Sequence, residues 1–281
     1  MQNLTIYAMH GVVDTLDINC LCHRTMHDRT LFANHLAKRP KKYVTINDAL
    51  NGRGDALTID DATVAAKEAA LLARSHGHEV SLFANPYNVV LQKSYFFHQI
   101  NMLLDSTTAT SIAVSGVSLP SITLSEKVKV KKKIKEQYCR LSMEGERSLL
   151  VAELAAQLGV TNVPLPRFLA TLSTEDLTYL RKQGVAIENH GWSHADYSRL
   201  SDACVKLEVE DGQQWLMANG FGQNYHFAVP FGHPLPTRHQ AFPHCTVWFL
   251  ENHNIPPGPI GKGIWRQETT AKVWNRTQLV L

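Results

Sequence analysis

The chain of 281 residues contains few cysteines, little net charge and no long apolar run, and each lack argues against a class of protein. Its five cysteines form an odd set without CxxC spacing, which argues against a disulfide framework and indicates a reduced, cytoplasmic protein. A net charge of +3 gives no overall field for nucleic acid or a membrane surface. No apolar stretch approaches the roughly 20 residues of a membrane span, and the N-terminal stretch is typical of a first strand, not of a signal peptide.

Two short segments suggest binding chemistry but have simpler interpretations. Residues 20–23, Cys-Leu-Cys-His, could bind a metal, but no second cysteine pair completes four ligands, so we interpret them as structural. The basic run at 127–140 could bind phosphate groups. Because the run is short and acidic residues follow it, we interpret it as a solvated helix face with partly buried apolar residues, namely Val128, Val130, Ile134 and Tyr138.

Alternating strand and helix signals dominate much of the chain. Residues 55–60, 62–77 and 78–84 predict a strand, an Ala-rich helix and a strand, which make a βαβ unit with parallel strands. The same rhythm returns later, with helices predicted at 172–184 and 201–220 and strands at 185–189, 225–230 and 245–250. We expect Ser173 to cap the first of these helices, and glycines to break or end the second. These units favour a single α/β barrel or an open parallel sheet.

One region interrupts the rhythm. Residues 86–170 contain an aromatic stretch, one strand signal at 110–116 and the basic run. We therefore expect one domain over residues 1–281 with an inserted, mainly helical region at about 86–170.

Polar pairs follow two of the predicted strands. Asp60 and Asp61 end the strand LTID, and His190 and His194 follow the strand VAIEN in the pattern HxxxH. Functional groups of βα folds collect where strands end, so both pairs should lie at the same edge. Two imidazoles and one carboxylate form an open shell for zinc or a similar divalent ion. The second aspartate could then act as a general base toward the activated water.

Each pair also has a simpler interpretation. The aspartates could cap the helix that starts near residue 62, and the histidines could belong to a polar loop. Each explanation is reasonable for one pair alone. Two such pairs at the ends of strands on one edge favour the metal site.

Four segments, in order, resemble the polysaccharide deacetylases, also described as the NodB-homology or carbohydrate esterase family 4 fold. LTIDDA resembles the family's T-F-D-D motif, IENHGWSHADYSRLS its H-[ST]-x-x-H motif, and FAVPFG its R-x-P-Y-G motif. YAMHGVV resembles the first strand of the family. The combination in this order is fairly specific, whereas any one motif alone is weak.

The resemblance implies a distorted (β/α)7-type barrel and a metal-dependent deacetylase. Carried over to this chain, it implies that Asp61, His190 and His194 bind the metal and that Asp60 is the general base. It also implies that the backbone N–H of Phe231 helps to hold the oxyanion.

The chain departs from the family pattern in several places. The motif-three Arg falls at Ala228, so whatever orients Asp60 comes from elsewhere or is missing. Ala62 replaces the Gly after the aspartates, and Gly191 replaces the Ser or Thr after the first histidine. The late motif, which supplies a histidine as general acid, has no match. The possible substitutes are His233, which is nearest to the expected edge, and His239, His244 and His253.

Three further residues are candidates for the substrate pocket. Trp192, between the two histidines, could stack on a sugar ring or could be a packed loop aromatic. Pro230 belongs to the FAVPFG segment. His10 could support the site as a neighbour of the metal ligands, or could be a buried polar residue.

The leading hypothesis is a cytoplasmic hydrolase that removes an acyl group, in the first place acetyl, from the amide nitrogen of an N-acetylated sugar or sugar conjugate. The substrate is a small or carrier-linked molecule, and no nucleic-acid partner is expected. Zinc is the expected metal, with iron, cobalt or manganese as alternatives. The competing hypotheses are a C–N hydrolase for a non-sugar amide, a metal-containing binding protein with impaired catalysis, and a scaffold without metal.

Overall fold

The computed structural model of the protein describes most of the chain. The described residues are 5–17, 19–114, 119–123, 127–138, 144–161, 164–197, 200–224, 226–232, 246–250 and 272–278. Within these ranges, seven parallel strands close into a barrel in the order β1-β11-β10-β9-β8-β5-β4. The strands are β1 (Ile6–Met9), β4 (Ala56–Asp60), β5 (Ser81–Ala84), β8 (Ala186–Asn189), β9 (His226–Ala228), β10 (Thr246–Leu250) and β11 (Lys272–Gln278). The predicted distorted (β/α)7-type barrel is confirmed.

The strand predictions locate most of this barrel. The predicted first strand and the ranges 55–60, 78–84, 185–189, 225–230 and 245–250 each contain one of its strands. The sequence analysis missed β11, which pairs with both β10 and β1 and so closes the barrel. Two very short strands, β2 (Val12–Val13) and β3 (His27–Asp28), pair outside it.

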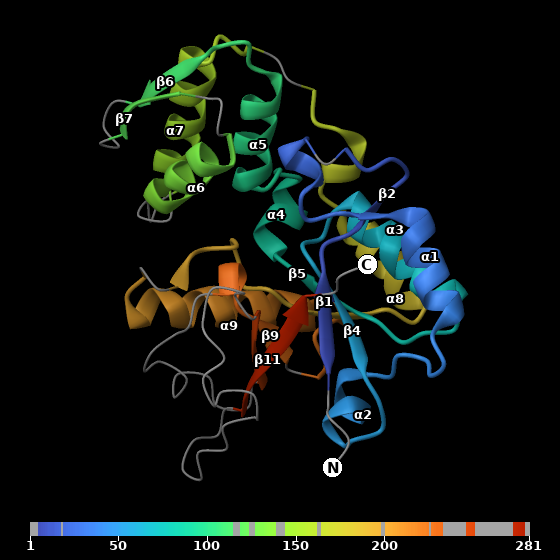
Figure 1. Ribbon diagram of the computed structural model, residues 1–281. Helices are drawn as coiled ribbons and strands as arrows, with labels where there is room; N and C mark the ends of the chain where they lie inside the picture. The colour runs from blue at the N-terminus through green and yellow to red at the C-terminus, as the bar shows by residue number, and fades with distance from the viewer. Residues whose placement is uncertain are drawn as a thin grey trace.

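Helices cover the outside of the barrel, as Figure 1 shows for α1, α3 and α8 on one side and α9 on another. These helices are α1 (Arg29–Lys38), α2 (Ile46–Leu50), α3 (Val64–Ser75), α8 (Thr174–Lys182) and α9 (Asp202–Ala218). The predicted cap of α8 is confirmed, since Ser173 and Asp176 form a capping box. The buried face of α3 is alanine, which lets the helix lie close to the barrel.

Residues 86–170 contribute further elements, most of which Figure 1 shows above the barrel. They are α4 (Pro86–Leu91), α5 (Phe96–Ser106), β6 (Ser111–Val114), β7 (Leu119–Thr123), α6 (Lys127–Tyr138), α7 (Glu144–Gln157) and the 3-10 turn η3 (Arg167–Leu169). The predicted strand at 110–116 contains β6, and the sequence analysis missed its antiparallel partner β7. Buried residues of α5, α6 and α7 form their own apolar cluster, which includes Leu104, Val130 and Leu154.

The basic run forms α6, and its apolar residues differ in burial. Val130 and Ile134 are buried at 0% and 1% exposure and pack against α5 and α7. Val128 is 46% exposed. The expectation that it is partly buried is therefore wrong, because its side chain faces outward. The side chain of Tyr138 lies outside the described residues. None of the helices in the described ranges has the length and apolarity of a membrane span.

Glycine allows α9 to lie against the end of β8. The helix runs without a break through Gly212 and ends at Ala218, before Gly220, which agrees with the expectation that glycines break or end it. A Cβ at Gly212 would lie 2.7 Å from Asn189 Oδ1. That oxygen accepts a hydrogen bond from the Gly191 N–H, and the Asn189 amide donates to the Val209 carbonyl oxygen. The Asn189 side chain is therefore fixed, and only a glycine fits opposite it.

We expect Gly212→Ala to lower the free energy of unfolding. Alanine gains about 1 kcal/mol of helix propensity, but overpacking against a fixed side chain costs about 2 kcal/mol or more, so the net loss should be about 1–2 kcal/mol. Chemical denaturation measures this difference. Asp211→Ala is the matched control, because Asp211 is exposed on the same helix. Equal stability of the two variants would contradict the packing role of Gly212.

Candidate metal centre

The carboxyl ends of neighbouring barrel strands bring the predicted residues together. Asp60 ends β4, and Asp61 follows it. His190 follows Asn189, the last residue of β8. Strand β5 lies between β4 and β8 and is parallel to both, so the three strands end at one edge. The sequence prediction that both polar pairs share an edge therefore agrees with the fold.

Asp61, His190 and His194 converge on one point at this edge. His194 Nε2 lies 3.3 Å from Asp61 Oδ1, and His190 Nε2 lies 3.6 Å from the same oxygen. The two imidazole rings are nearly perpendicular, with centroids 4.9 Å apart. One ligand atom from each of the three residues lies within 4.8 Å of the other two.

The simpler interpretations of the two pairs do not hold. The N-cap of α3 is Thr63, whose side chain accepts from the Ala66 N–H, so neither aspartate caps this helix. The histidines are not part of an exposed polar loop, since His190 is 2% exposed and His194 7%. Asp61 is 2% exposed. Burial of three such side chains together is costly unless they serve one another or a ligand.

The backbone at this edge adopts unusual conformations. Asp61 and His194 have positive φ values of 65° and 56°. Phe231, after β9, has a φ of 62°. Left-handed backbone at residues other than glycine is unfavourable and persists where the surrounding structure imposes it, often at functional sites. Here it occurs at two of the three converging residues and at the segment facing them.

Hydrogen bonding and burial prepare His190 to act as a ligand. Its Nδ1 lies 2.8 Å from the Ala228 carbonyl oxygen. An N–H at Nδ1 donates to that carbonyl and leaves the lone pair on Nε2, the nitrogen facing Asp61. Burial lowers the pKa of His190 to about 4, so the ring is neutral near pH 7. Ala228 stands where the family has an arginine, and its carbonyl oxygen helps to orient a metal ligand.

Asp61 is held in its ionised form. Burial alone would raise its pKa, but the neighbouring His194 ring, together with the rings of His10 and His190, lowers the pKa well below its usual range. His10 therefore lies close enough to act on Asp61, as a supporting residue would. An ionised carboxylate and a neutral imidazole are the forms in which these side chains bind divalent metals.

The residues fit a divalent cation. Among the described residues, Asp61 Oδ1 has no hydrogen-bond partner, although the atom is buried. Bonds of about 2.1 Å to nitrogen and oxygen place the ligand atoms of a tetrahedral site about 3.4 Å apart. The distances of 3.3 and 3.6 Å bracket this value. A cation at this point would satisfy the buried oxygen and both ring nitrogens.

Two residues that the sequence analysis missed hold the segment 190–194 in place. Glu208 on α9 accepts from the Ser193 N–H at 2.9 Å and from the Ser193 hydroxyl at 2.6 Å. Asn85, directly after β5, donates to the carbonyl oxygens of His190 and Gly191. Two features of the sequence could have indicated these residues. Glu208 is a charged residue on the apolar face of a predicted helix, and Asn85 is a polar residue at the end of a predicted strand.

Aromatic rings enclose His194. The rings of Tyr95, Phe97 and Phe231 lie 5.5, 5.0 and 4.6 Å from its imidazole, measured between centroids. The Tyr95 hydroxyl accepts from the Ala62 N–H, next to Asp61. A cavity borders His194 on this side, between the barrel and the group of helices above it, and is lined by Tyr87, Ser94, Phe97, Gln99, Ser148 and Ser193 among others.

The other candidate residues lie as follows. Asp60 is buried beside Asp61, at 3% exposure. Trp192 is half-buried and packs edge-on against Tyr87, as a packed loop aromatic does. Pro230 is buried before Phe231. The four possible substitutes for the late-motif histidine, namely His233, His239, His244 and His253, lie outside the described residues.

Comparison with known proteins indicates one family. The family named Polysaccharide deacetylase matches residues 144–243, which include the HxxxH and FAVPFG segments but not Asp60 and Asp61. Sequence comparison with curated proteins finds no match.

Solved structures share the fold across nearly the whole chain. The deacetylase PplD of Streptococcus pyogenes, in complex with acetate, has a TM-score of 0.57 at 10% identity and covers 99% of this chain and 92% of its own. A de-N-acetylase from Aggregatibacter actinomycetemcomitans has a TM-score of 0.52 at 11% identity, covering 97% and 93%. IcaB from Ammonifex degensii has a TM-score of 0.50 at 13% identity, covering 88% and 84%. The family match and the shared fold confirm the resemblance to the polysaccharide deacetylases that the sequence motifs indicate.

Proposed function

We propose that the protein is a metal-dependent deacetylase that hydrolyses the amide of an N-acetylated sugar or sugar conjugate. The observation that carries the proposal is the convergence of Asp61, His190 and His194 on one buried point at the carboxyl edge of the barrel. The family match and the similar structures, which include a deacetylase and a de-N-acetylase, support the reaction class.

The chain's residues have distinct parts in this proposal. A divalent cation, in the first place zinc, held by Asp61, His190 and His194 would supply Lewis acidity, which polarises a carbonyl group and lowers the pKa of water. Asp60, buried next to Asp61, takes a proton from the attacking water as the general base. His10 lies beside Asp61 and helps to keep that carboxylate ionised.

Phe231 supports the proposal from the end of β9, the strand next to β8. Its φ of 62° sets the orientation of the peptide groups after β9, where the family's oxyanion-holding amide is found. The Phe231 N–H would donate to the carbonyl oxygen as negative charge develops on it. Its ring meanwhile packs against His194, at a centroid distance of 4.6 Å. The residue thus links the catalytic edge to the aromatic wall of the cavity.

The cavity next to His194 suits a sugar ring. Tyr87 and Phe97 offer aromatic surface, and Ser94, Gln99 and Ser148 offer hydrogen-bonding groups. Sugar sites combine these two kinds of group, because one face of the ring is apolar and its edge carries hydroxyls. Pro230 and Trp192 lie near the same edge and would shape it through packing.

A metal-containing binding protein is the second candidate. Ala228 occupies the place of the family arginine, so the side chain at this position cannot orient Asp60 as an arginine would. Such a protein would bind the metal and an acylated ligand without cleaving it. The variants below separate the two candidates.

Asp60→Asn should lower kcat/KM by about 10²–10⁴-fold, the usual contribution of a general base, while metal content stays at the wild-type level. Asp61→Asn should lower metal content as well, because it removes a ligand charge. Metal analysis together with acetate release measures both effects, and Asp211→Asn on the exposed face of α9 is the matched control. A wild-type protein that binds metal but releases no acetate from any acylated substrate would favour the binding protein.

The class of amide substrate can be identified by comparing acetylated compounds with and without a sugar. Because the cavity combines aromatic and hydroxyl-binding groups, N-acetylhexosamine conjugates should release acetate faster than simple acetamides of similar size. The measurement is kcat/KM for acetate release over a panel that varies only the sugar. Equal rates for sugar and non-sugar amides would contradict the sugar assignment and favour a general C–N hydrolase.

A further inference from the structure

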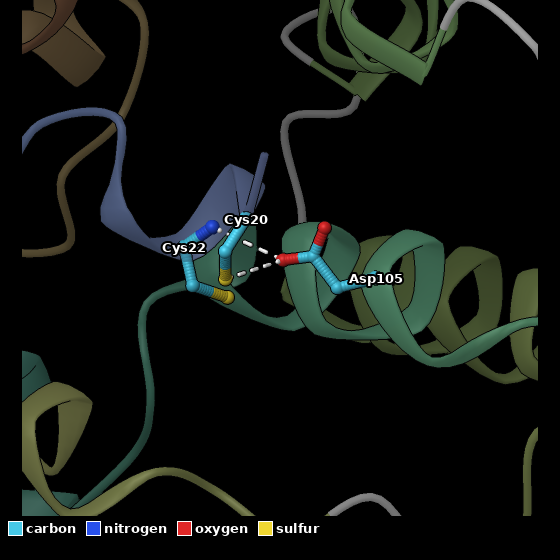
Figure 2. Close-up of side chains that lie close together, drawn as sticks. All are labelled: Cys20, Cys22 and Asp105. Atoms are coloured by element: carbon cyan, nitrogen blue, oxygen red, sulfur yellow. Dashed lines mark hydrogen bonds between the residues drawn. The ribbon is translucent and has the colours of Figure 1, made fainter. Parts of the chain in front are cut away.

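A second group of metal-binding side chains lies away from the carboxyl edge of the barrel. Cys20 and Cys22 flank the start of the 3-10 turn η1 (Leu21–His23), in the segment between β2 and β3. Asp105 lies in the last turn of α5. Figure 2 shows both sulfur atoms on the side that faces the Asp105 carboxylate. One ligand atom from each of the three residues lies within 4.8 Å of the others.

Hydrogen bonds hold the two cysteines and the Asp105 carboxylate close to one another. The Cys20 thiol donates to Asp105 Oδ2 at 3.2 Å. The N–H groups of Leu21 and Cys22 donate to Oδ1 and Oδ2 of the same carboxylate, at 3.0 and 3.1 Å. These backbone bonds fix the carboxylate against the turn. A cation bound to the sulfur and the oxygen would take the place of the thiol proton.

The position of Asp105 favours a cation. The last turn of a helix is the negative end of its dipole, where cations are favoured and carboxylates are not. Asp105 adds a negative charge at this end of α5, and two thiolates would add two more. A divalent cation would offset most of this charge. The backbone donors from η1 offset it only in part.

We propose that Cys20, Cys22 and Asp105 form a second metal site, for a thiophilic divalent ion of the zinc type, that ties η1 to α5. Bonds of about 2.3 Å to sulfur and about 2.0 Å to oxygen place these ligands about 3.5 Å apart in a tetrahedral site. The thiol and carboxylate of the Cys20–Asp105 pair, 3.2 Å apart, need to move only a few tenths of an ångström. Cys20 and Asp105 are partly exposed, which gives the ion a route of entry.

The site differs from two simpler uses of the cysteines. Cys22, at 4% exposure, also packs in an apolar cluster with Met26, Met102 and Leu169, and packing alone would explain its burial. Packing does not explain why a carboxylate faces both sulfurs. A disulfide between Cys20 and Cys22 would remove the thiol that donates to Asp105 Oδ2 at 3.2 Å. The site is independent of the proposed deacetylase reaction.

The test is cobalt substitution of the full-length, reduced protein. Cobalt bound to Cys20 and Cys22 should give the thiolate-to-cobalt absorption of the near ultraviolet. Cys20→Ser combined with Cys22→Ser should abolish this band and lower the metal bound by one ion per chain. Asp105→Asn keeps an oxygen for the turn but removes a charged ligand, so it should weaken cobalt binding by at least the roughly 10-fold that loss of a ligand's supporting partner costs.

Two controls separate this site from the first one. His190→Gln should leave the thiolate–cobalt band unchanged, and so should Cys204→Ser, which removes an exposed cysteine of α9. The proposal is overturned if the wild-type protein shows no such band. It is overturned equally if the band survives in the double serine variant.

Discussion

The alignment of parallel strand ends is the constraint on which the candidate metal centre depends. Asp61 and His190 extend from strands that are separated by β5, and neither is near the other in sequence. The shared direction of β4, β5 and β8 brings their ends to one edge, and Asn85 at the end of β5 holds the histidine segment by its carbonyl groups. The left-handed backbone at Asp61 and His194 then turns both side chains toward one point.

The group of helices at residues 86–170 completes this edge from above. Tyr95 and Phe97 place their rings on His194, and Phe231 from the barrel packs between the two parts. The aromatic wall limits water near the ligand atoms, and low local polarity strengthens the interactions that a buried charge makes. The proposed second metal site would also join the barrel side to this group of helices, because it would link η1 to α5.

The sequence predicted the barrel strands and the metal-binding candidates because both leave local signals. Asp60, Asp61, His190 and His194 follow apolar strands, and hydrophobic patterning alone indicates where strands end. Glu208, Tyr95 and Asp105 could not be found this way, since their partners are set by tertiary packing between distant segments. The strand β11 gave no recognised signal, and the close approach of Gly212 to Asn189 could not be predicted because it joins α9 to the end of β8.

Anomalous diffraction at a metal absorption edge tests the central claim most directly. The account predicts a strong peak bonded to Asp61, His190 and His194 at distances of about 2.0–2.2 Å. Absence of a peak among these three side chains, in crystals grown with zinc in excess, would contradict the assignment of this edge as a metal centre.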